Sequence, residues 1–383
     1  MKILLDATAI PPSLAGVGRY VDEIAPALIN EGVDMTVVCQ ESYSQRARTY
    51  AGNEKVIALG KEYEPRSRRM RWEQMELPRL ISSLDVDLLL SPHYTMPHKR
   101  LKNLRGEQIP TVVTLHDATF FTMPEVHTWL KRYFFRYATK YATRRAAHLI
   151  VPSRATRDEV IRFTQASESQ FTVAYHGVDH KRFHSVTDEQ KQRVAQSLGL
   201  GDSAYIAFLG LIEPRKNVPA LIRAWVQACS DMPQPPALVL AGSKGWDTTV
   251  EAEMEKVPPH LRVLAPGYLP LEDLPGFLAG AHIVAYPSLG EGFGLPVLEA
   301  MACGAAVLTT RKLSLPEVGG DAVEYCGTDV PDIAQGIRTL LSDEQRRIEL
   351  GALGMERAQG FTWKAAAGQH LEAFRAALGN GKN

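Results

Sequence analysis

The sequence predicts an α/β protein made of two doubly wound parallel-sheet domains. Short apolar runs alternate with stretches of helical period along most of the 383 residues, as in a parallel sheet with crossover helices. The chain is longer than one hydrophobic core usually serves, so two domains are expected. A polar stretch at residues 185–202 separates two such alternating series.

The composition is that of an ordinary water-soluble globular protein, with 45% hydrophobic and 22% charged residues. The formal net charge is zero, so the overall charge does not favour nucleic acid as a partner. The cysteines stand far apart and form no zinc or disulfide pattern, which fits a reducing compartment: Cys39, Cys229, Cys303 and Cys326. The first residues are too short an apolar run for a signal peptide, so we expect a cytoplasmic protein.

The first half reads as strands that alternate with helices. Strands are predicted at residues 2–6, 34–39, 87–92, 111–117 and 148–153, and helices at 20–30, around 77–81, at 127–148 and from 156. His116 and Asp117 follow a strand, and ligands of open parallel sheets bind at the carboxyl ends of strands. The loop at residues 11–20 contains Gly16 and Gly18, for which a plain tight turn is an alternative.

The second half repeats this pattern. Strands are predicted at residues 204–210, 237–241, 263–264, 283–286 and 308–309, and helices at 218–229, from 273, at 296–303, at 344–355 and after 363. The last helix is rich in alanine.

A glycine-rich loop joins a strand to a helix at residues 287–295. Three glycines surround Glu291, and Pro296 suits the first turn of the helix. In such a loop the backbone N–H groups and the helix dipole converge on a phosphate. Glu291 and Glu299 would repel a phosphate, but both suit hydrogen bonds from sugar hydroxyls on either side of a diphosphate. Surface glutamates on an ordinary strand–turn–helix unit are the alternative.

The string Glu-Gly-Phe-Gly-Leu-Pro-Val-Leu-Glu-Ala-Met-Ala-Cys-Gly at residues 291–304 resembles the signature of the retaining family 4 glycosyltransferases. The Arg-Lys-Asn segment at 215–217 and the glycine loop at 16–20 are similar to other segments of that family. The resemblance implies the GT-B fold, in which two Rossmann-like domains face each other across a cleft. Residues 1–182 would form the acceptor-side domain, residues 183–363 the nucleotide-sugar domain, and residues 364–383 a helix that packs back on the first domain.

The resemblance also implies roles for individual residues. Glu299 would bind ribose hydroxyls, Glu291 would bind hydroxyls of the transferred sugar, and the stretch at 267–269 would flank the base. The implied catalytic residues are Glu291, Arg215, Lys216 and His116, and the implied donor-binding residues are Gly16, Gly18, Gly267, Tyr268, Gly292, Phe293, Gly294, Leu295 and Glu299. A structural role is the alternative for a lone histidine at a strand end such as His116.

Arg215 and Lys216 stand between a strand and a helix, so both cations should point to the carboxyl edge of the sheet. Departure of a nucleoside diphosphate increases the charge on its distal oxygens, and two fixed cations would stabilise that transition state. No second carboxylate is placed as a covalent nucleophile, so we expect the acceptor to attack from the face of the leaving group. No metal-ligand pattern occurs, so neither a metal nor another cofactor is expected.

Two basic and aromatic stretches occur at residues 66–72 and 131–145. They would dock on anionic lipid headgroups near a lipid-linked acceptor, so the protein would be peripheral on the inner face of the membrane. In the alternative, the aromatic side chains form the core face of a helix and the basic side chains its wet face.

We therefore expect a retaining, metal-independent glycosyltransferase that moves a hexose from a nucleotide sugar to an acceptor. The segments at residues 4–8, 16–20 and 91–94 look most like the mannosyltransferase branch that builds bacterial surface polysaccharides. This likeness favours GDP-mannose as donor and a glycan or polyprenyl-diphosphate-linked saccharide as acceptor. Two alternatives stay open: a nucleotide-sugar epimerase of the same fold, and a non-catalytic scaffold that binds sugar nucleotides.

Overall fold

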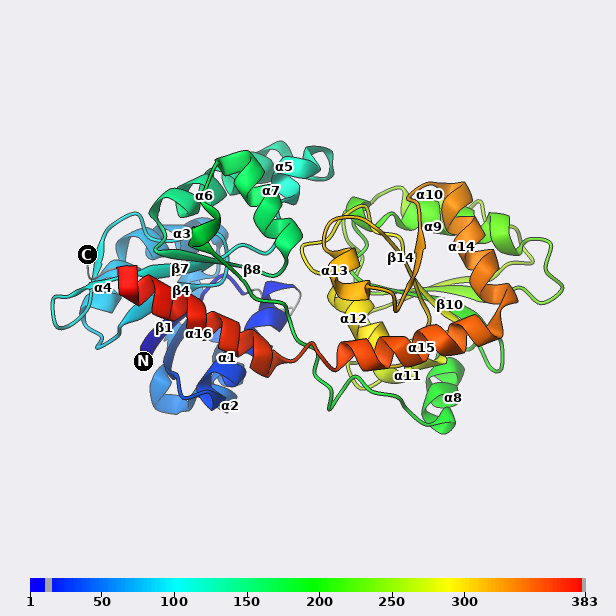
Figure 1. The fold of residues 1–383 in the computed structure, drawn as a ribbon, viewed down its shortest axis with the longest axis horizontal. Helices are drawn as coiled ribbons and strands as arrows, with labels where there is room; N and C mark the ends of the chain where they lie inside the picture. The colour runs from blue at the N-terminus through cyan, green and yellow to red at the C-terminus, as the bar shows by residue number, and fades with distance from the viewer. Residues whose placement is uncertain (11–15, 381–383) are drawn as a thin grey trace. The chain divides into compact units, whose positions relative to one another are not determined.

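The computed structural model describes residues 1–10 and 16–380 (Figure 1). The chain divides into two compact units. Unit 1 is Met1–Gly177 together with Trp363–Asn383, and unit 2 is Val178–Thr362. The limits expected from the sequence follow residues 182 and 363.

Unit 1 contains a seven-stranded parallel sheet of order β3-β2-β1-β4-β7-β8-β9. Its strands are β1 (Lys2–Ala7), β2 (Asp34–Gln40), β3 (Val56–Leu59), β4 (Leu88–Ser91), β7 (Thr111–Thr114), β8 (His148–Val151) and β9 (Phe171–Val173), and β5 (Leu101–Lys102) pairs with β6 (Gln108–Ile109) outside it. Its helices are α1 (Val17–Asn30), α2 (Glu41–Ala51), α3 (Arg66–Met75), α4 (Leu77–Ser82), α5 (Thr119–Thr122), α6 (Trp129–Arg145), α7 (Arg154–Thr164) and α16 (Trp363–Asn380). The order of winding reverses between β1 and β4, which makes this pair the topological switch point.

The side chains of consecutive strand residues in unit 1 pack on opposite faces of the sheet. Ile3 and Leu5 of β1 pack with α1, α2 and α16, whereas Leu4 packs with α3 and α4. On β7, Val112 packs with the first group and Val113 with α5, α6 and α7. Figure 1 shows α1, α2 and α16 on one side of this sheet and α3, α6 and α7 on the other. Because both faces are buried, the strands are continuous apolar runs.

The last helix, α16, belongs to unit 1 although unit 2 precedes it in the chain. Its buried residues pack against α1 and the sheet: Ala366, Ala367, Ala373, Phe374 and Ala377. His370 is fully buried, and its Nε2 lies 2.6 Å from the hydroxyl of Tyr20 on α1.

Unit 2 contains a six-stranded parallel sheet of order β12-β11-β10-β13-β14-β15. Its strands are β10 (Tyr205–Leu209), β11 (Ala237–Ala241), β12 (Val263–Gly267), β13 (Ile283–Tyr286), β14 (Val307–Thr310) and β15 (Glu324–Cys326). Its helices are α8 (Asp188–Ser197), α9 (Val218–Cys229), α10 (Val250–Met254), α11 (Leu274–Gly280), α12 (Leu295–Ala302), α13 (Leu315–Gly319), α14 (Val330–Ser342) and α15 (Glu344–Ala358). Figure 1 shows α9, α10 and α14 on one side of this sheet and α8, α11, α12 and α15 on the other. The switch point of unit 2 lies between β10 and β13.

Several elements of the structure differ from expectation. The polar stretch at 185–202 contains α8, which begins at a capping box formed by Thr187 and Gln190. Helix α1 begins at Val17, so Gly18 lies in its first turn and not in the preceding loop. The pair α2 and β3 was not predicted, because their residues show little apolar periodicity.

Two expectations about the chain as a whole can be compared with the structure. Cys39, Cys229 and Cys303 are buried and Cys326 is half-buried, and none of them forms a disulfide. Within residues 1–10 and 16–380, no helix is long and apolar enough to cross a bilayer.

Candidate active site

The switch point of unit 2 gathers three charged residues that the sequence singled out. The loop after β10 contains Arg215 and Lys216 in one 3-10 turn, and the loop after β13 contains Glu291. Because β10 and β13 are neighbours, both loops leave the sheet at the same point of its carboxyl edge. Open parallel sheets bind their ligands at this position.

Glu291 is buried, and its carboxylate accepts several hydrogen bonds. Its Oε1 lies 2.7 Å from Nζ of Lys216 and 2.7 Å from Oγ of Ser288, and it accepts a hydrogen bond from the Tyr286 hydroxyl at 3.1 Å. Its Oε2 forms an ion pair with Arg215. The side chains from both loops are therefore joined by one carboxylate.

Arg215 also pairs with a second buried carboxylate, that of Glu213, at 2.5 Å. We call Glu213, Arg215, Lys216 and Glu291 the charged cluster. Its two cations and two carboxylates sum to zero formal charge. Three of its four side chains are less than one tenth exposed, so water screens the charges weakly.

The cations keep Glu291 ionised. Burial alone would raise the pKa of Glu291, but the charges of Arg215 and Lys216 and the hydrogen bonds from Lys216 and Ser288 lower it to about 2. At neutral pH this carboxylate is therefore an anion and a very weak base.

The pKa of Lys216, the partner of Glu291 in this ion pair, is also shifted. Burial and the charge of Arg215 lower the pKa of Lys216, and the two carboxylates offset only part of that effect. The directions agree with the geometry, because Glu291 meets two cations while Lys216 is enclosed beside another cation. An added anion close to Nζ would raise the pKa of Lys216, so the charged cluster has capacity for further negative charge.

Hydroxyl groups hold the loop after β13 in place. Thr310 on β14 donates a hydrogen bond to the backbone oxygen of Ser288 at 2.7 Å. Oγ of Ser314 lies 2.8 Å from the backbone oxygens of both Glu291 and Phe293. Burial and the charge of Glu291 raise the pKa of Tyr286 far above its ordinary value, so its phenol stays protonated as a hydrogen-bond donor.

Glycines allow the loops after β10 and β11 to touch through their backbones. A Cβ at Gly242 would lie 1.9 Å from the backbone oxygen of Gly210, and one at Gly245 would lie 1.9 Å from that of Ile212. Gly242 also has φ +135°, which disfavours other residues. This close contact fixes the start of the loop that leads to Arg215.

Helix α12 starts at the end of the glycine loop. Gly294 is its N-cap with φ +110°, and Leu295 is its first residue, one residue earlier than predicted. The free N–H groups and the dipole give this end a partial positive charge. Glu299 is the fifth residue of the same helix and is buried. Gly292 and Phe293 complete the loop between Glu291 and α12.

Gly267 and Tyr268 lie two strands away from β10 on the same edge of the sheet. Gly267 ends β12 with φ +79°, and its backbone oxygen accepts a hydrogen bond from Gly242 at 2.8 Å. Tyr268 is 64% exposed. The structure thus places both at the carboxyl edge, and their contact with a base stays a prediction.

The three remaining predicted site residues belong to unit 1. Gly16 precedes α1 with φ +47°, and Gly18 is buried in its first turn. His116 follows β7, and its Nε2 lies 2.7 Å from the backbone oxygen of Pro92. Burial lowers the pKa of His116, and its ring packs edge-on to Tyr20. Their proposed contact with the donor stays a prediction.

Sequence reasoning missed three residues that contact the charged cluster or belong to it: Glu213, Tyr286 and Ser288. Glu213 follows β10, Ser288 follows β13, and Tyr286 is the last residue of β13. Their position at strand ends was therefore the signal that could have identified them. In unit 2 that signal was applied only to Arg215, Lys216 and Glu291.

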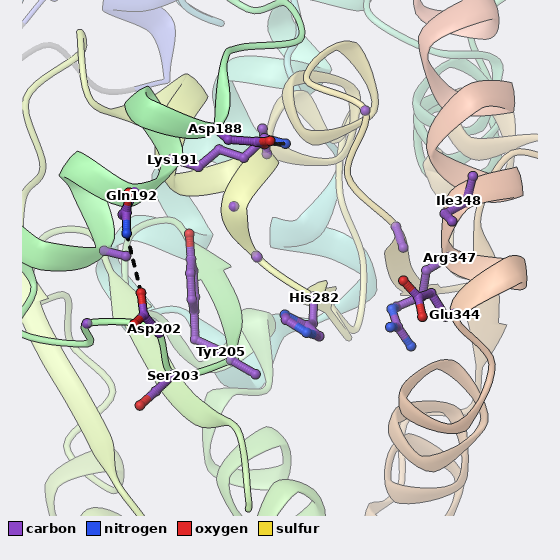
Figure 2. A pocket seen from close by; sticks show the side chains of 18 residues that line it. Asp188, Lys191, Gln192, Asp202, Ser203, Tyr205, His282, Glu344, Arg347 and Ile348 are labelled. Carbon is purple, nitrogen blue, oxygen red and sulfur yellow. Dashed lines mark hydrogen bonds and ion pairs between the residues drawn. The ribbon is translucent and has the colours of Figure 1, made fainter.

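A pocket of about 600 Å³ lies at the opposite edge of the sheet of unit 2 (Figure 2). Tyr205 begins β10 and His282 directly precedes β13, so these lining residues mark the amino ends of the strands. Figure 2 also shows Lys191 of α8 and Arg347 of α15 around the pocket. Because parallel sheets bind ligands at the carboxyl edge, the charged cluster is the stronger candidate for the active site.

Among the described residues, one set has ligand atoms close enough to hold a metal ion: Asp6, Glu73 and His93 in unit 1. Arg69 donates a hydrogen bond to Glu73 at 2.9 Å, and His93 lies 3.3 Å from Asp6. Because the guanidinium of Arg69 already binds the carboxylate of Glu73, this set is better described as a buried ion-pair network than as a metal site.

Comparison with known proteins agrees with these features. Residues 14–182 match Glycosyltransferase Family 4, and residues 190–356 match Glycosyl transferases group 1. O-antigen chain mannosyltransferase B of Escherichia coli is 30% identical over 286 residues, which cover 74% of this chain and 73% of that protein. The serotype-specific mannosyltransferase WbdA of Escherichia coli is 30% identical over 71% of this chain, a match that spans 34% of WbdA.

The fold agrees as well. The crystal structure of Anabaena HepE in complex with UDP and glucose superposes with a TM-score of 0.76 over 97% of this chain and 98% of that chain, at 19% identity. The chain therefore belongs to the family 4 glycosyltransferases and has the GT-B fold.

Proposed function

We propose that the protein is a retaining, metal-independent hexosyltransferase that moves mannose from GDP-mannose to a glycan or polyprenyl-diphosphate-linked acceptor in polysaccharide synthesis. The observation that carries this proposal is the charged cluster, which puts two cations at the ligand edge of unit 2. The choice of mannose is supported by the 30% identity to an O-antigen mannosyltransferase.

Arg215 and Lys216 would bind the diphosphate of the donor. The lowered pKa of Lys216 supports this role, because a diphosphate beside Nζ supplies the negative charge that the cluster can still take up. Negative charge grows on the leaving phosphate as the glycosidic bond breaks, so both cations act most strongly in the transition state.

Glu291 would orient the transferred sugar. Its Oε1 is held by Lys216, Ser288 and Tyr286, while its Oε2 contacts Arg215. When Arg215 turns to the diphosphate, Oε2 becomes available to accept hydrogen bonds from sugar hydroxyls.

The pKa of Glu291 also bears on the mechanism. A carboxylate with a pKa of about 2 is a poor general base, so Glu291 would not take the proton of the acceptor hydroxyl. The leaving phosphate oxygen lies on the face that the acceptor attacks and would take that proton. This route accounts for retention without a covalent intermediate.

A donor panel tests the proposal. GDP-mannose, UDP-glucose, UDP-N-acetylglucosamine and dTDP-rhamnose are added in thermal-shift and calorimetric titrations, with and without EDTA. We expect stabilisation by GDP-mannose that EDTA does not change and that the double variant Arg215→Gln, Lys216→Gln abolishes. Lys244→Gln, an exposed lysine of unit 2, is the matched control and should keep the response.

The outcomes of this panel are distinct. Preference for another donor would refute GDP-mannose, loss of binding on chelation would refute metal independence, and binding to no donor would refute a donor site in unit 2. Incubation with the preferred donor alone separates transfer from epimerisation, because an epimerase converts the sugar without an acceptor. The anomeric configuration of the product, read by NMR, tests retention.

The exposed face of α6 supports a peripheral contact with an anionic membrane. Trp129, Tyr133 and Tyr137 follow one another at every fourth residue and are 73%, 72% and 52% exposed, so they form one stripe. Phe134 and Phe135 are half-buried, Phe135 packs against a buried cluster of unit 1, and the ring of Phe134 packs edge-on to that of Phe135. Residues 128–147 contain six basic and no acidic side chains: Lys131, Arg132, Arg136, Lys140, Arg144 and Arg145.

Vesicle co-sedimentation tests the membrane contact. We expect binding to vesicles that contain phosphatidylserine, because anionic lipid attracts basic segments, and little binding to vesicles of neutral lipid alone. Trp129→Ala with Tyr133→Ala should weaken the binding, whereas Trp246→Ala, which removes an exposed tryptophan of unit 2, should not. Equal binding to neutral and anionic vesicles, or equal loss in both variants, would contradict the proposal.

A further inference from the structure

Unit 1 has a pocket of about 770 Å³ at the carboxyl edge of its own sheet. Thr8 after β1, Gln40 at the end of β2 and His93 after β4 line its inner part. Since β1 and β4 form the switch point of unit 1, this pocket has the place in unit 1 that the charged cluster has in unit 2. None of the site residues expected from the sequence lines it.

Gln40 presents an unsatisfied acceptor in this pocket. Its side chain is 5% exposed, and its Nε2 donates hydrogen bonds to the backbone oxygens of Thr8 at 3.2 Å and Tyr63 at 3.1 Å. Two carbonyl partners identify the nitrogen end of the amide, which leaves Oε1 as the other end. This buried Oε1 has no hydrogen-bond partner among the described residues. A ligand hydroxyl would supply the missing donor.

The charged residues that line the pocket are mainly basic: Arg66, Arg69 and Lys131 against Glu64. Arg69 is already paired with Glu73 at 2.9 Å. Arg66 lies over the rings of Phe134 and Phe135 and forms no ion pair with a carboxylate in the described part of the chain.

Arg66 is thus a cation held in place by aromatic rings. Burial and the charge of Arg69 lower its pKa, so a neighbouring anion would stabilise its charged form. The buried acidic side chains Asp6 and Glu73 do not line the pocket and are engaged by His93 and Arg69.

The wall of the pocket is aromatic. Tyr94, Phe134 and Phe135 line it, and the ring of Phe135 packs edge-on to that of Tyr94 at 5.1 Å between centroids. Aromatic faces beside a hydroxyl acceptor suit the apolar face and the hydroxyls of a sugar ring. The volume is large enough for more than one sugar residue, since ligand pockets of roughly 300–1,000 Å³ hold drug-sized molecules.

We propose that this pocket binds the acceptor and that the acceptor is a glycan that carries a phosphoryl group. Arg66 and Lys131 hold the phosphoryl group, Oε1 of Gln40 accepts a sugar hydroxyl, and a sugar ring lies against the aromatic wall. This inference rests on the proposed glycosyl transfer and narrows its acceptor to phosphate-bearing saccharides. A lipid-linked saccharide and a soluble glycosyl phosphate offer the same chemistry to the pocket.

Binding of three probes to the full chain tests the inference: α-mannose 1-phosphate, octyl α-mannosyl phosphate and the neutral methyl α-mannoside. GDP is present at saturation so that a donor site in unit 2 is filled, and affinities are measured by ligand-observed NMR. The double variant Arg66→Gln, Lys131→Gln is compared with Arg71→Gln, Lys140→Gln, which changes the same charges on the same two helices outside the pocket.

We expect both phosphorylated probes to bind more tightly than methyl α-mannoside. The pocket double variant should weaken them about tenfold or more, the control double variant should not, and Gln40→Leu should weaken all three probes. Tighter binding of the octyl ester than of mannose 1-phosphate identifies a lipid-linked source, and equal binding identifies a soluble one.

Two results would overturn the inference. One is equal affinity for methyl α-mannoside and mannose 1-phosphate, and the other is an equal loss in the pocket and control variants. Binding of GDP itself is the separate readout of the proposed function. If GDP binds and the pocket variants change nothing, the acceptor site is wrong while the donor site stands. If GDP does not bind, GDP-mannose fails as the proposed donor, whatever the pocket variants do.

Discussion

Replacing Glu291 by glutamine should destabilise unit 2 by about 3 kcal/mol at pH 7. The pKa of Glu291 is about 2 against an ordinary value of 4.5, and that difference corresponds to about 3 kcal/mol in favour of the ionised folded state. Glutamine keeps the shape of the side chain but leaves Arg215 and Lys216 with Glu213 as their nearest carboxylate. Removing one partner of a buried ion pair costs about 3–5 kcal/mol in other proteins, which agrees with this figure.

The effect should depend on pH in a defined window. The folded-state pKa of Glu291 is depressed, so its contribution to stability is complete above about pH 4.5 and is lost as the pH falls through 2. The difference in unfolding free energy between wild type and Glu291→Gln should therefore shrink over that interval.

Pulsed hydrogen exchange after equilibration in urea measures this difference for unit 2 alone. Peptides that cover β13 report the opening of the central strand pair, whatever unit 1 does. Glu251→Gln is the matched control, because it removes an exposed carboxylate paired with Lys244 in the same unit, and it should behave as wild type. An unchanged stability in Glu291→Gln, or a loss that stays constant down to pH 2, would refute the reasoning.

Three further predictions concern catalysis, backbone packing and pH. Arg215→Gln should lower kcat about 10²-fold with a smaller change in donor affinity, and steady-state kinetics in which kcat stays within threefold of wild type would contradict its role. Gly242→Ala should prevent stable folding of unit 2, because its Cβ would meet the backbone oxygen of Gly210, whereas Gly201→Ala, with a positive φ but open space, should lower the melting temperature only slightly. The pKa of His370 is lowered to about 4, chiefly by burial, so unit 1 should lose about 3 kcal/mol as the pH falls from 6.5 through 4. His370→Gln should make that slope shallower in urea titrations followed through peptides of β1, and an unchanged slope would argue against it.

Much of the architecture was predictable because buried parallel strands have a plain sequence pattern. The runs at residues 204–210 and 283–286 are apolar throughout and correspond to β10 and β13, whose buried faces leave no room for polar residues. The glycine loop with Pro296 likewise marked the start of α12 to within one residue. By contrast, α2 and α8 are polar helices with few buried residues, so periodicity gave little sign of them.

Three of the four residues of the charged cluster were predictable, but the contacts between them were not. Strand ends and the family likeness pointed to Arg215, Lys216 and Glu291, because residues after parallel strands converge on one edge. The ion pairs between them, and the participation of Tyr286 and Ser288, depend on side-chain directions in two loops that are 70 residues or more apart in the chain. The pocket of unit 1 was missed for the same reason: Gln40 becomes notable only when its amide is seen to be held by two carbonyl groups.

The course of α16 has a consequence for synthesis of the chain on the ribosome. Unit 2 is one uninterrupted segment, so all of its core residues are synthesised before α16. Unit 1 begins first but lacks the side chains that α16 adds to its core, such as Phe374, until unit 2 has been synthesised. The half of the protein that is made first is therefore finished last, and its sheet must wait with one face partly uncovered while the other half folds.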